Sequence, residues 1–436
     1  MKYFSKRFLT VLAVLFLASS ISLFSFDFSD ITDTLTDLGY FTDSKTEGAT
    51  SFRSLLIPVG GRSESLGSAY TGLCDDAGYI NFNSAASCIL NETQACAFHN
   101  SWIADSKLDT LVYTTHIDNL GFGFQASCLY LPFSEYNIFG ERVNSSYYSE
   151  TNLAANISYN FLAGYDFKGI AVGATVKTAF RSVPDYTDND TDAIIPLSGL
   201  EQSGLAIMAD LGIMLQFNFL KFFASRTPNV RIGLSAQNLG AAITGFAGKS
   251  GIKLDDPLPT FFAAGISCQF LPIITATFDI KQPVNLFEPT DYQMFSLSAG
   301  VILAFTKQFN LLMGTEFKGG NPRFSIGSEF QLSKARFNFN YTLDLTSSFN
   351  PINRISLSAK ILLGDRGRAE RQQLIDKLYT KGLEYYANSE WEKAIEEWQA
   401  ILILNKRYDP AILGIESARS QIEMYAKVRE SMFFEE

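Results

Sequence analysis

The sequence predicts an all-β membrane protein: a transmembrane barrel of about fourteen antiparallel strands, with a small carboxy-terminal α-helical domain. Three observations predict this class. Between residues 94 and 363 the chain repeats, about fourteen times, a run of roughly ten residues in which apolar side chains alternate with small or polar ones. Aromatic content is 14%, whereas charged residues make up only 18%. Long and short connections also tend to alternate along the chain, as they do in outer-membrane barrels.

The segment 205–218 shows the alternation most clearly. Its odd positions, from Leu205 to Phe217, are all apolar, and its even positions include Asp210 and Gln216. Because successive side chains of a strand point to opposite faces, one face is wholly apolar and the other tolerates charge. A transmembrane barrel needs this combination, in segments of about 9–11 residues.

The first residues resemble a secretory signal. Lys2, Lys6 and Arg7 precede an apolar run from Phe8 to Phe24, which predicts a signal peptide over 1–26. The Ser-Leu-Phe-Ser sequence is a poor cleavage site, so an uncleaved anchor stays an alternative. No later apolar run reaches 18 residues, which excludes a helical membrane protein. The net charge of −10 gives a nucleic-acid partner no electrostatic support.

Residues 27–93 precede the predicted strands. Residues 27–48 are polar and weakly patterned, as expected of a tether, and the chain then becomes rich in Gly and Ala from Arg53 to Ala86. Small residues at this density let the backbone pack closely, which favours a segment inside another structure. An irregular periplasmic loop is the alternative.

This stretch resembles the hatch of the FadL family of outer-membrane long-chain fatty acid transporters and of their PorV-like and treponemal relatives. Asp75 and Asp76 match the family's paired-acid step, and Asn83-Ser84-Ala85 matches its Asn-Pro-Ala turn with Ser in place of Pro. The segment 235–240, with the following Asp-Pro-Leu-Pro, and the segment 353–358 extend the resemblance over about residues 50 to 363.

We expect the strands near 94–101, 109–117, 119–130, 150–160, 169–183, 204–218, 229–240, 259–270, 273–282, 292–304, 309–319, 323–333, 335–345 and 353–363. Long connections follow the third, fifth and seventh strands, at 131–149, 184–203 and 241–258. Several connections after even strands are tight. Long loops on one side and short turns on the other are typical of outer-membrane barrels, and a secreted β-sandwich gives no reason for them.

The inward parity of these strands carries charges of both signs. Internal ion pairs explain most of them. In a lumen of this kind one or two cations could instead bind a fatty acid carboxylate, because Arg matches a carboxylate fork. The candidates are Lys177, Arg181, Arg231 and Arg336.

After a linker at 364–370 the apolar spacing becomes helical, and Pro410 starts another helix. The pattern Gly382, Tyr385, Trp391, Ala394 and Trp398 resembles a tetratricopeptide repeat, so residues 371–436 are expected to form a periplasmic helical domain. A single repeat packs on a neighbour. Its expected role is to bind a periplasmic protein, and a stabilising plug or a self-association surface is the alternative.

The sequence predicts no enzyme, metal or cofactor. Its two histidines, His99 and His116, have no nearby Ser, Cys or acid at a recognised catalytic spacing, although distant strands could assemble a pair. The five cysteines show no paired or metal-binding spacing.

The resemblance implies a barrel in contact with the lipid of the cell outer membrane that takes up long-chain fatty acids or similar hydrophobic molecules by hatch-gated diffusion. With an even strand count both termini would be periplasmic. The family's lateral exit lies near the third strand, where Gly121 and Gly123 predict a bulge. The alternatives are a non-transporting PorV-like anchor that recruits a partner through the helical domain, and a passive solute pore.

Overall fold

The computed structural model describes residues 50–433 apart from 104, 137–138, 166, 184–187, 189–190, 192, 194, 196–202, 245–256, 287–293, 319–320 and 346–351. The expected signal peptide (1–26) and tether (27–48) lie outside the described residues.

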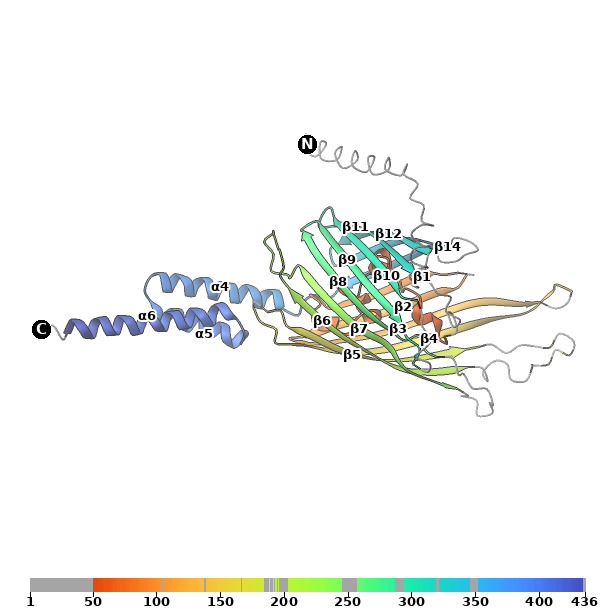
Figure 1. Ribbon diagram of the computed structural model, residues 1–436, viewed down its shortest axis with the longest axis horizontal. Coiled ribbons are helices and arrows are strands. Elements are labelled where there is room, and N and C mark those ends of the chain that lie inside the picture. The colour runs from red at the N-terminus through yellow and green to blue at the C-terminus, as the bar shows by residue number, and fades with distance from the viewer. Residues whose placement is uncertain are drawn as a thin grey trace, which may run out of the picture. The chain divides into compact units, whose positions relative to one another are not determined.

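Fourteen antiparallel strands form a closed barrel (Figure 1). Each strand pairs with its neighbours in sequence, and β1 pairs with β14 to close the sheet. The strands are β1 (Gln94–Ser101), β2 (Lys107–Ile117), β3 (Leu120–Tyr136), β4 (Arg142–Phe161), β5 (Ile170–Ser182), β6 (Gly204–Phe217), β7 (Val230–Thr244), β8 (Phe261–Leu271), β9 (Ile274–Pro283), β10 (Ser296–Ala304), β11 (Phe309–Lys318), β12 (Asn321–Leu332), β13 (Ala335–Asp344) and β14 (Ile352–Leu362). The predicted fourteen-stranded antiparallel barrel is confirmed.

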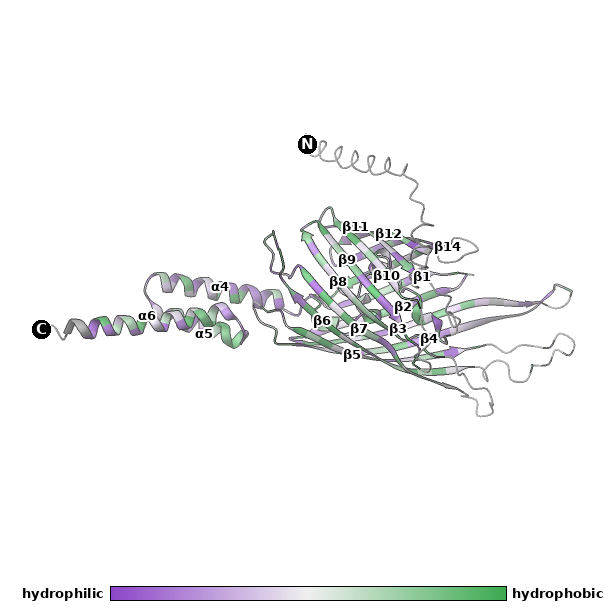
Figure 2. Cartoon of the chain, in the orientation of Figure 1, coloured by the Kyte–Doolittle hydropathy of each residue, from purple (hydrophilic) through white to green (hydrophobic). Residues whose placement is uncertain are grey.

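The two faces of the wall differ as the alternation requires. Val176 is 58% exposed and Leu211 is 52% exposed on the outside, whereas Thr175 and Asp210 on the same strands are buried inside. Figure 2 shows this alternation as changes between hydrophobic and hydrophilic residues along the strands. The inside of the barrel is therefore the polar side, and the outside is apolar.

The hairpin of β3 and β4 is longer than the sequence predicts. Residues 131–149 were expected to form a long loop, but most of them continue the two strands, with Leu131 paired to Tyr148 and Phe133 to Ser146. This region lacks a clean apolar face, so alternation could not identify it as strand. Long connections are therefore confirmed after β5 and β7 and are wrong after β3.

Residues 50–93, which we call the inner segment, pack against the inward faces of the strands. They form short helical turns: η2 (Arg53–Leu56), α3 (Gly61–Ser65), η3 (Ala77–Asn81) and η4 (Ser84–Cys88). A Cβ atom added at Gly314 would lie 1.9 Å from the Leu66 carbonyl carbon, and one at Gly121 would lie 2.3 Å from the Cys88 nitrogen. Inward glycines with such contacts are Gly121, Gly173, Gly212, Gly233, Gly265, Gly300, Gly314 and Gly327. These glycines form a belt that makes room for the inner segment.

Three helices follow the barrel: α4 (Arg368–Ala387), α5 (Trp391–Leu404) and α6 (Asp409–Phe433). Helix α4 begins three residues earlier than the expected 371, because the Asp365 carboxylate accepts hydrogen bonds from the backbone N–H groups of Gly367 (3.1 Å) and Ala369 (2.6 Å). Among the described helices, none combines the length and apolarity needed to cross a membrane.

The side chains expected to lock the helices together do so. Trp398 of α5 is 1% exposed and lies against Gly382 of α4 and Gly414 of α6, and Ala394 is fully buried. Tyr385 and Trp391 pack at the edge of this cluster. The assignment of these helices to the tetratricopeptide class stays a prediction.

Replacing Gly382 by Val should loosen the helical domain, because its Cβ position lies 2.3 Å from Trp398 Nε1. Overpacking of this kind costs about 1–3 kcal/mol. We expect faster trypsin cleavage within 368–433 of the full-length protein. Ala387→Val, on an exposed position of the same helix, is the control, and equal cleavage rates in the two variants would contradict this packing.

Candidate functional site

The paired acids Asp75 and Asp76 hold the inner segment together and to the wall. Tyr70 donates its hydroxyl hydrogen bond toward both carboxylates, at 2.8 Å to Asp75 Oδ1 and 2.7 Å to Asp76 Oδ1. Asp75 also forms an ion pair with Arg62 at 3.1 Å. Asp76 caps η3 and forms a buried ion pair with Lys360 of β14 at 2.6 Å.

The charge state of Asp76 follows from these contacts. Burial raises the pKa of its carboxyl group, but the Lys360 ammonium, the Tyr70 hydroxyl and Arg62 outweigh burial and hold the pKa below its ordinary value of 3.8. Asp76 is therefore ionised at neutral pH, which places a complete ion pair between the inner segment and β14.

Further contacts attach the inner segment around the barrel. Arg62 donates to Glu329 of β12 at 2.6 Å, and Glu64 lies 3.4 Å from Arg354 of β14. Farther along the sheet, one oxygen of Asp279 in β9 accepts hydrogen bonds from the backbone N–H groups of Tyr70 (2.8 Å) and Thr71 (2.6 Å). These contacts fix the inner segment at several strands.

The predicted turn at Asn83, Ser84 and Ala85 lies in the same interior. The Asn83 side chain accepts a hydrogen bond from the Ala85 N–H at 3.1 Å and donates to the Ile213 carbonyl of β6 at 3.1 Å. The hydroxyl groups of Ser84 and Thr175 lie 2.8 Å apart. The Asn83 side chain thus closes the turn by hydrogen bonding to the backbone, although Ser84 stands where the motif has the more rigid Pro.

The bulge expected at Gly121 and Gly123 is wrong. Strand β3 pairs with β2 and β4 without a register shift at either residue. A Cβ atom at Gly123 would lie 2.0 Å from the Tyr79 hydroxyl oxygen, so these glycines accommodate the inner segment. A lateral exit at this place stays a prediction, with no bulge to support it.

A register shift does occur where β7 carries the Asn-Leu-Gly motif. The pairing of β6 with β7 shifts between Ala209 and Leu211, and Asn238 has a φ of 58°. The Asn238 N–H donates to Asp210 Oδ1 at 2.8 Å, and Asp210 forms a buried ion pair with Lys177 at 2.5 Å. The motif therefore builds a bulge whose polar groups are satisfied inside the wall.

We number each connection by the strand that it follows, so that the β1–β2, β3–β4 and β5–β6 connections are odd-numbered. A cavity of about 1010 Å³ lies between the inner segment and the strand ends that lead into the odd-numbered connections. One part of its wall is apolar and includes Ile57, Leu129 and Phe261. Lys281 of β9 contributes positive charge, and its ammonium lies 4.9 Å from the centroid of the Phe82 ring. Glu150, Glu316 and Asp344 also line the cavity, so its wall combines apolar side chains with charges of both signs.

None of the four predicted cations lines this cavity. Besides the paired Lys177, Arg231 donates to the Leu73 carbonyl at 2.8 Å, and Arg336 donates to Gln331 at 2.9 Å. Arg181 lies over the Phe52 ring, with its guanidinium carbon 5.8 Å from the ring centroid. The four side chains thus contact the protein itself and are not brought together, and their role in ligand binding stays a prediction.

The sequence does not single out the cations that the cavity contains. Arg354 lies 4.0 Å from the centroid of the Trp102 ring and pairs with Glu64, and Arg323 pairs with Glu316 at 2.6 Å. Lys281 was identifiable as an inward charge, but its position near the cavity depends on the inner segment, which alternation does not predict. Among the described residues no group of three His, Cys, Asp or Glu side chains could hold a metal ion.

The chain belongs to the uncharacterised protein family UPF0164, whose model matches residues 35–366. A UPF0164 protein of Treponema pallidum (strain Nichols) is 27% identical over 399 residues, which cover 89% of this chain and 88% of that protein. A second one from the same organism is 28% identical over 406 residues, covering 90% and 80%.

Two solved barrels are similar to this chain. The CymD monoaromatic hydrocarbon channel matches with a TM-score of 0.48 and 14% identity, over 71% of this chain and 98% of that one. The Pseudomonas putida toluene transporter TodX matches with a TM-score of 0.44 and 13% identity, over 69% and 96%.

Replacing Lys360 by Met should destabilise the barrel by about 3–5 kcal/mol, because it leaves the Asp76 carboxylate buried without its partner. Adding Asp76→Asn should recover part of the loss. In the unaltered protein the contribution of Asp76 is complete above about pH 4 and is lost as the pH falls through its lowered folded pKa. Urea unfolding in detergent measures both effects.

The control is Lys393→Met, which removes an exposed ion pair with Glu390 and should leave the unfolding midpoint unchanged. Equal effects of Lys360→Met and Lys393→Met would mean that the inner segment is not held by this ion pair.

Proposed function

We propose that this member of the UPF0164 family is an outer-membrane channel for the uptake of hydrophobic or amphiphilic molecules, with long-chain fatty acids as the substrate class. The observation that carries the proposal is the cavity of about 1010 Å³, which combines an apolar wall with Lys281. Transport by diffusion requires only that the substrate binds inside the barrel and is then released from it.

Membrane insertion is supported by the outer face. Large apolar side chains stand exposed on strands all around the barrel, among them Leu111 (64%), Phe262 (47%), Phe339 (51%) and Ile355 (58%). An exposed apolar surface of this extent is unfavourable in water and suits the hydrocarbon of a bilayer. We infer that the odd-numbered connections face outward from the cell.

The periplasmic side then holds the even-numbered turns, the start of β1, the end of β14 and the helical domain, whereas the Ser51 N–H donates to the Pro257 carbonyl of the β7–β8 connection at 3.0 Å, at the opposite end of the barrel. Contacts of that domain with the even turns support this orientation: Arg226, between β6 and β7, pairs with Asp376 at 2.8 Å, and the rings of Tyr165 and Tyr408 lie 4.9 Å apart.

The inner segment would act as the hatch. It blocks the interior below the cavity, so a substrate can pass only if part of the segment moves. The ion pair of Asp76 with Lys360 and that of Arg62 with Glu329 oppose such movement. We therefore propose a gated route for substrates that first bind the cavity, and little conductance of small ions, which argues against a passive solute pore.

Lys281→Met should weaken binding of a fluorescent long-chain fatty acid by about tenfold or more, because a hydrogen bond to a charged group contributes about 1.5–3 kcal/mol. The alcohol of the same chain length should lose little, since it carries no charge. Equilibrium fluorescence titration of the refolded protein measures both. Lys334→Met, at the exposed β12–β13 turn, is the matched control.

Absence of saturable binding to the folded, unaltered barrel would contradict the transport proposal. A loss of the acid and the alcohol in equal measure would instead mean that Lys281 shapes the cavity and does not bind the head group.

A second candidate function is that of a PorV-like anchor, and the surface of the helical domain favours it. Ile403 is 82% exposed and Leu413 is 64% exposed. Exposed apolar side chains of this size suit contact with another protein. Truncation after Leu363 should then abolish capture of a periplasmic protein and leave fatty acid binding intact. Capture by the truncated barrel would contradict docking through these helices.

A further inference from the structure

Three side chains on the outer face of the β1–β2 hairpin have the geometry of a nucleophile with its base. His99 Nδ1 lies 2.6 Å from Asp109 Oδ1, and His99 Nε2 lies 3.5 Å from the Ser101 hydroxyl oxygen. No recognised sequence spacing relates these residues, and it is the hairpin that brings Asp109 to His99. The strand places His99 and Ser101 on one face, two residues apart, and the hairpin register pairs His99 with Asp109.

This arrangement settles which ring nitrogen must carry the proton for catalysis. With Nδ1–H donated to the Asp109 carboxylate, Nε2 keeps its lone pair and can accept the proton of Ser101. The Tyr130 hydroxyl also interacts with Asp109. Lys107 is the cross-strand partner of Ser101 on the same outward face, which places its side chain next to that of Ser101.

These side chains are unusual for the outer face of the barrel wall. Over the strand residues that the structure describes, the outward parity carries His99, Lys107 and Asp109 as its histidine and charged side chains, and all three lie in this hairpin. A charge on the lipid face costs up to about 2–4 kcal/mol at the midplane and little near the interface. They lie at the end of the hairpin nearest its connecting loop, where the cost is smallest.

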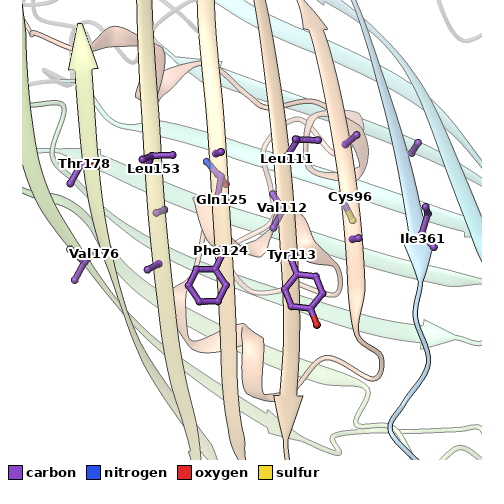
Figure 3. A pocket seen from close by; sticks show the side chains of 16 residues that line it. Cys96, Leu111, Val112, Tyr113, Phe124, Gln125, Leu153, Val176, Thr178 and Ile361 are labelled. Atoms are coloured by element: carbon purple, nitrogen blue, oxygen red, sulfur yellow. The ribbon is translucent and has the colours of Figure 1, made fainter.

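An apolar groove of about 880 Å³ lies on the same part of the wall (Figure 3). It is lined by Ala97 and Leu111, which are the next residues on the same strand faces as His99 and Asp109, together with Tyr113, Phe124 and Ile361. Figure 3 shows the labelled side chains Leu111, Tyr113 and Phe124 along neighbouring strands. Ala97 lies between the rest of the groove and His99 on β1, and its side chain is small. An acyl chain lying in the groove would bring its carbonyl group to Ser101.

We propose that Ser101, His99 and Asp109 form an acyl-ester hydrolase site that acts on ester-linked lipids from the outer face of the barrel. Ser101 Oγ attacks the ester carbonyl carbon while its proton passes to His99 Nε2. The oxyanion that forms is stabilised by the Lys107 ammonium. Collapse of this intermediate breaks the bond to the alcohol oxygen, and His99 returns its proton to the departing alcohol.

Water completes the reaction. His99 takes a proton from a water molecule, whose oxygen attacks the acyl-serine carbonyl carbon. The second intermediate releases the carboxylic acid, which ionises in solution, and His99 returns the proton to Ser101 Oγ. The sum is an ester and water giving an acid and an alcohol, with no redox change. Asp109 holds the imidazolium in place during both steps and is not itself protonated.

The substrate class follows from the surroundings. The groove takes an apolar acyl chain from the bilayer, and the charged end faces the interface, where the ester bonds of a glycerolipid lie. The released acid is a long-chain carboxylate, which is the class of molecule proposed for the interior cavity. The hydrolase inference does not depend on that proposal, because the two sites lie on opposite faces of the wall.

The test uses the full-length protein in vesicles of a diacyl phospholipid with a fluorogenic ester, together with a fluorophosphonate probe. We expect hydrolysis, and mass spectrometry should find the probe on Ser101. Ser101→Ala should abolish both signals. His99→Asn and Asp109→Asn should lower the rate by about 10²-fold or more, the usual contribution of a general base. Ser328→Ala, an outward serine of β12, is the matched control and should change neither signal.

Failure of the folded, unaltered protein to hydrolyse the ester or take up the probe would overturn the proposal. Hydrolysis that survives Ser101→Ala would overturn it as well. The groove is tested by Ala97→Trp, which should lower the ratio of the palmitoyl-ester rate to the butyryl-ester rate by about tenfold. An unchanged ratio would remove the groove from the site.

Discussion

The fit between the inner segment and the belt of inward glycines is the constraint on which the interior depends. At Gly314 and Gly121 the backbone of the inner segment approaches so closely that no side chain could be accommodated. A barrel of fourteen strands has a lumen too wide for its own side chains to fill, so a separate segment has to fill it. The glycines give that segment the room to bring its backbone polar groups against the wall.

The close approach of the inner segment to the wall also determines how its charged side chains are paired. Arg62, Glu64 and Asp76 of the inner segment are buried away from water, and each requires a partner of opposite sign. The strands supply Lys360 for Asp76, Glu329 for Arg62 and Arg354 for Glu64. These inward charges therefore hold the inner segment to the wall, and Lys281 is the cation at the cavity wall on which the proposed binding of a carboxylate rests.

Alternation predicted nearly every strand because each has one apolar outward face, and β1 was expected at the residues where it lies. It failed for the outer part of the β3–β4 hairpin, where Tyr147 and Tyr148 remove the contrast between faces. It also could not choose among Lys177, Arg181, Arg231 and Arg336, since their partners, such as Asp210 and Leu73, come from other elements. Side-chain parity can be predicted from one strand, but pairing across the lumen depends on how the whole chain folds.

The proximity of Ser101, His99 and Asp109 could have been predicted from strand spacing and the register of one hairpin. Residues 99 and 101 share a face by strand spacing alone, and the partner of His99 depends only on the register of one hairpin. From the sequence we expected the second strand to start at residue 109, whereas β2 begins at Lys107. The expected hairpin loop was therefore too long to give the correct register.

Residues 99–101 of β1 connect the two faces of the wall. Asn100, between His99 and Ser101, points inward and donates to the Pro58 carbonyl at 2.6 Å and to Glu64 at 3.3 Å. The strand that positions the outer triad is thus held from inside by the inner segment. Because strand geometry fixes residues 99 to 101 relative to one another, displacement of the inner segment removes the contacts that hold this part of β1, and the geometry of the outer site depends on the closed interior.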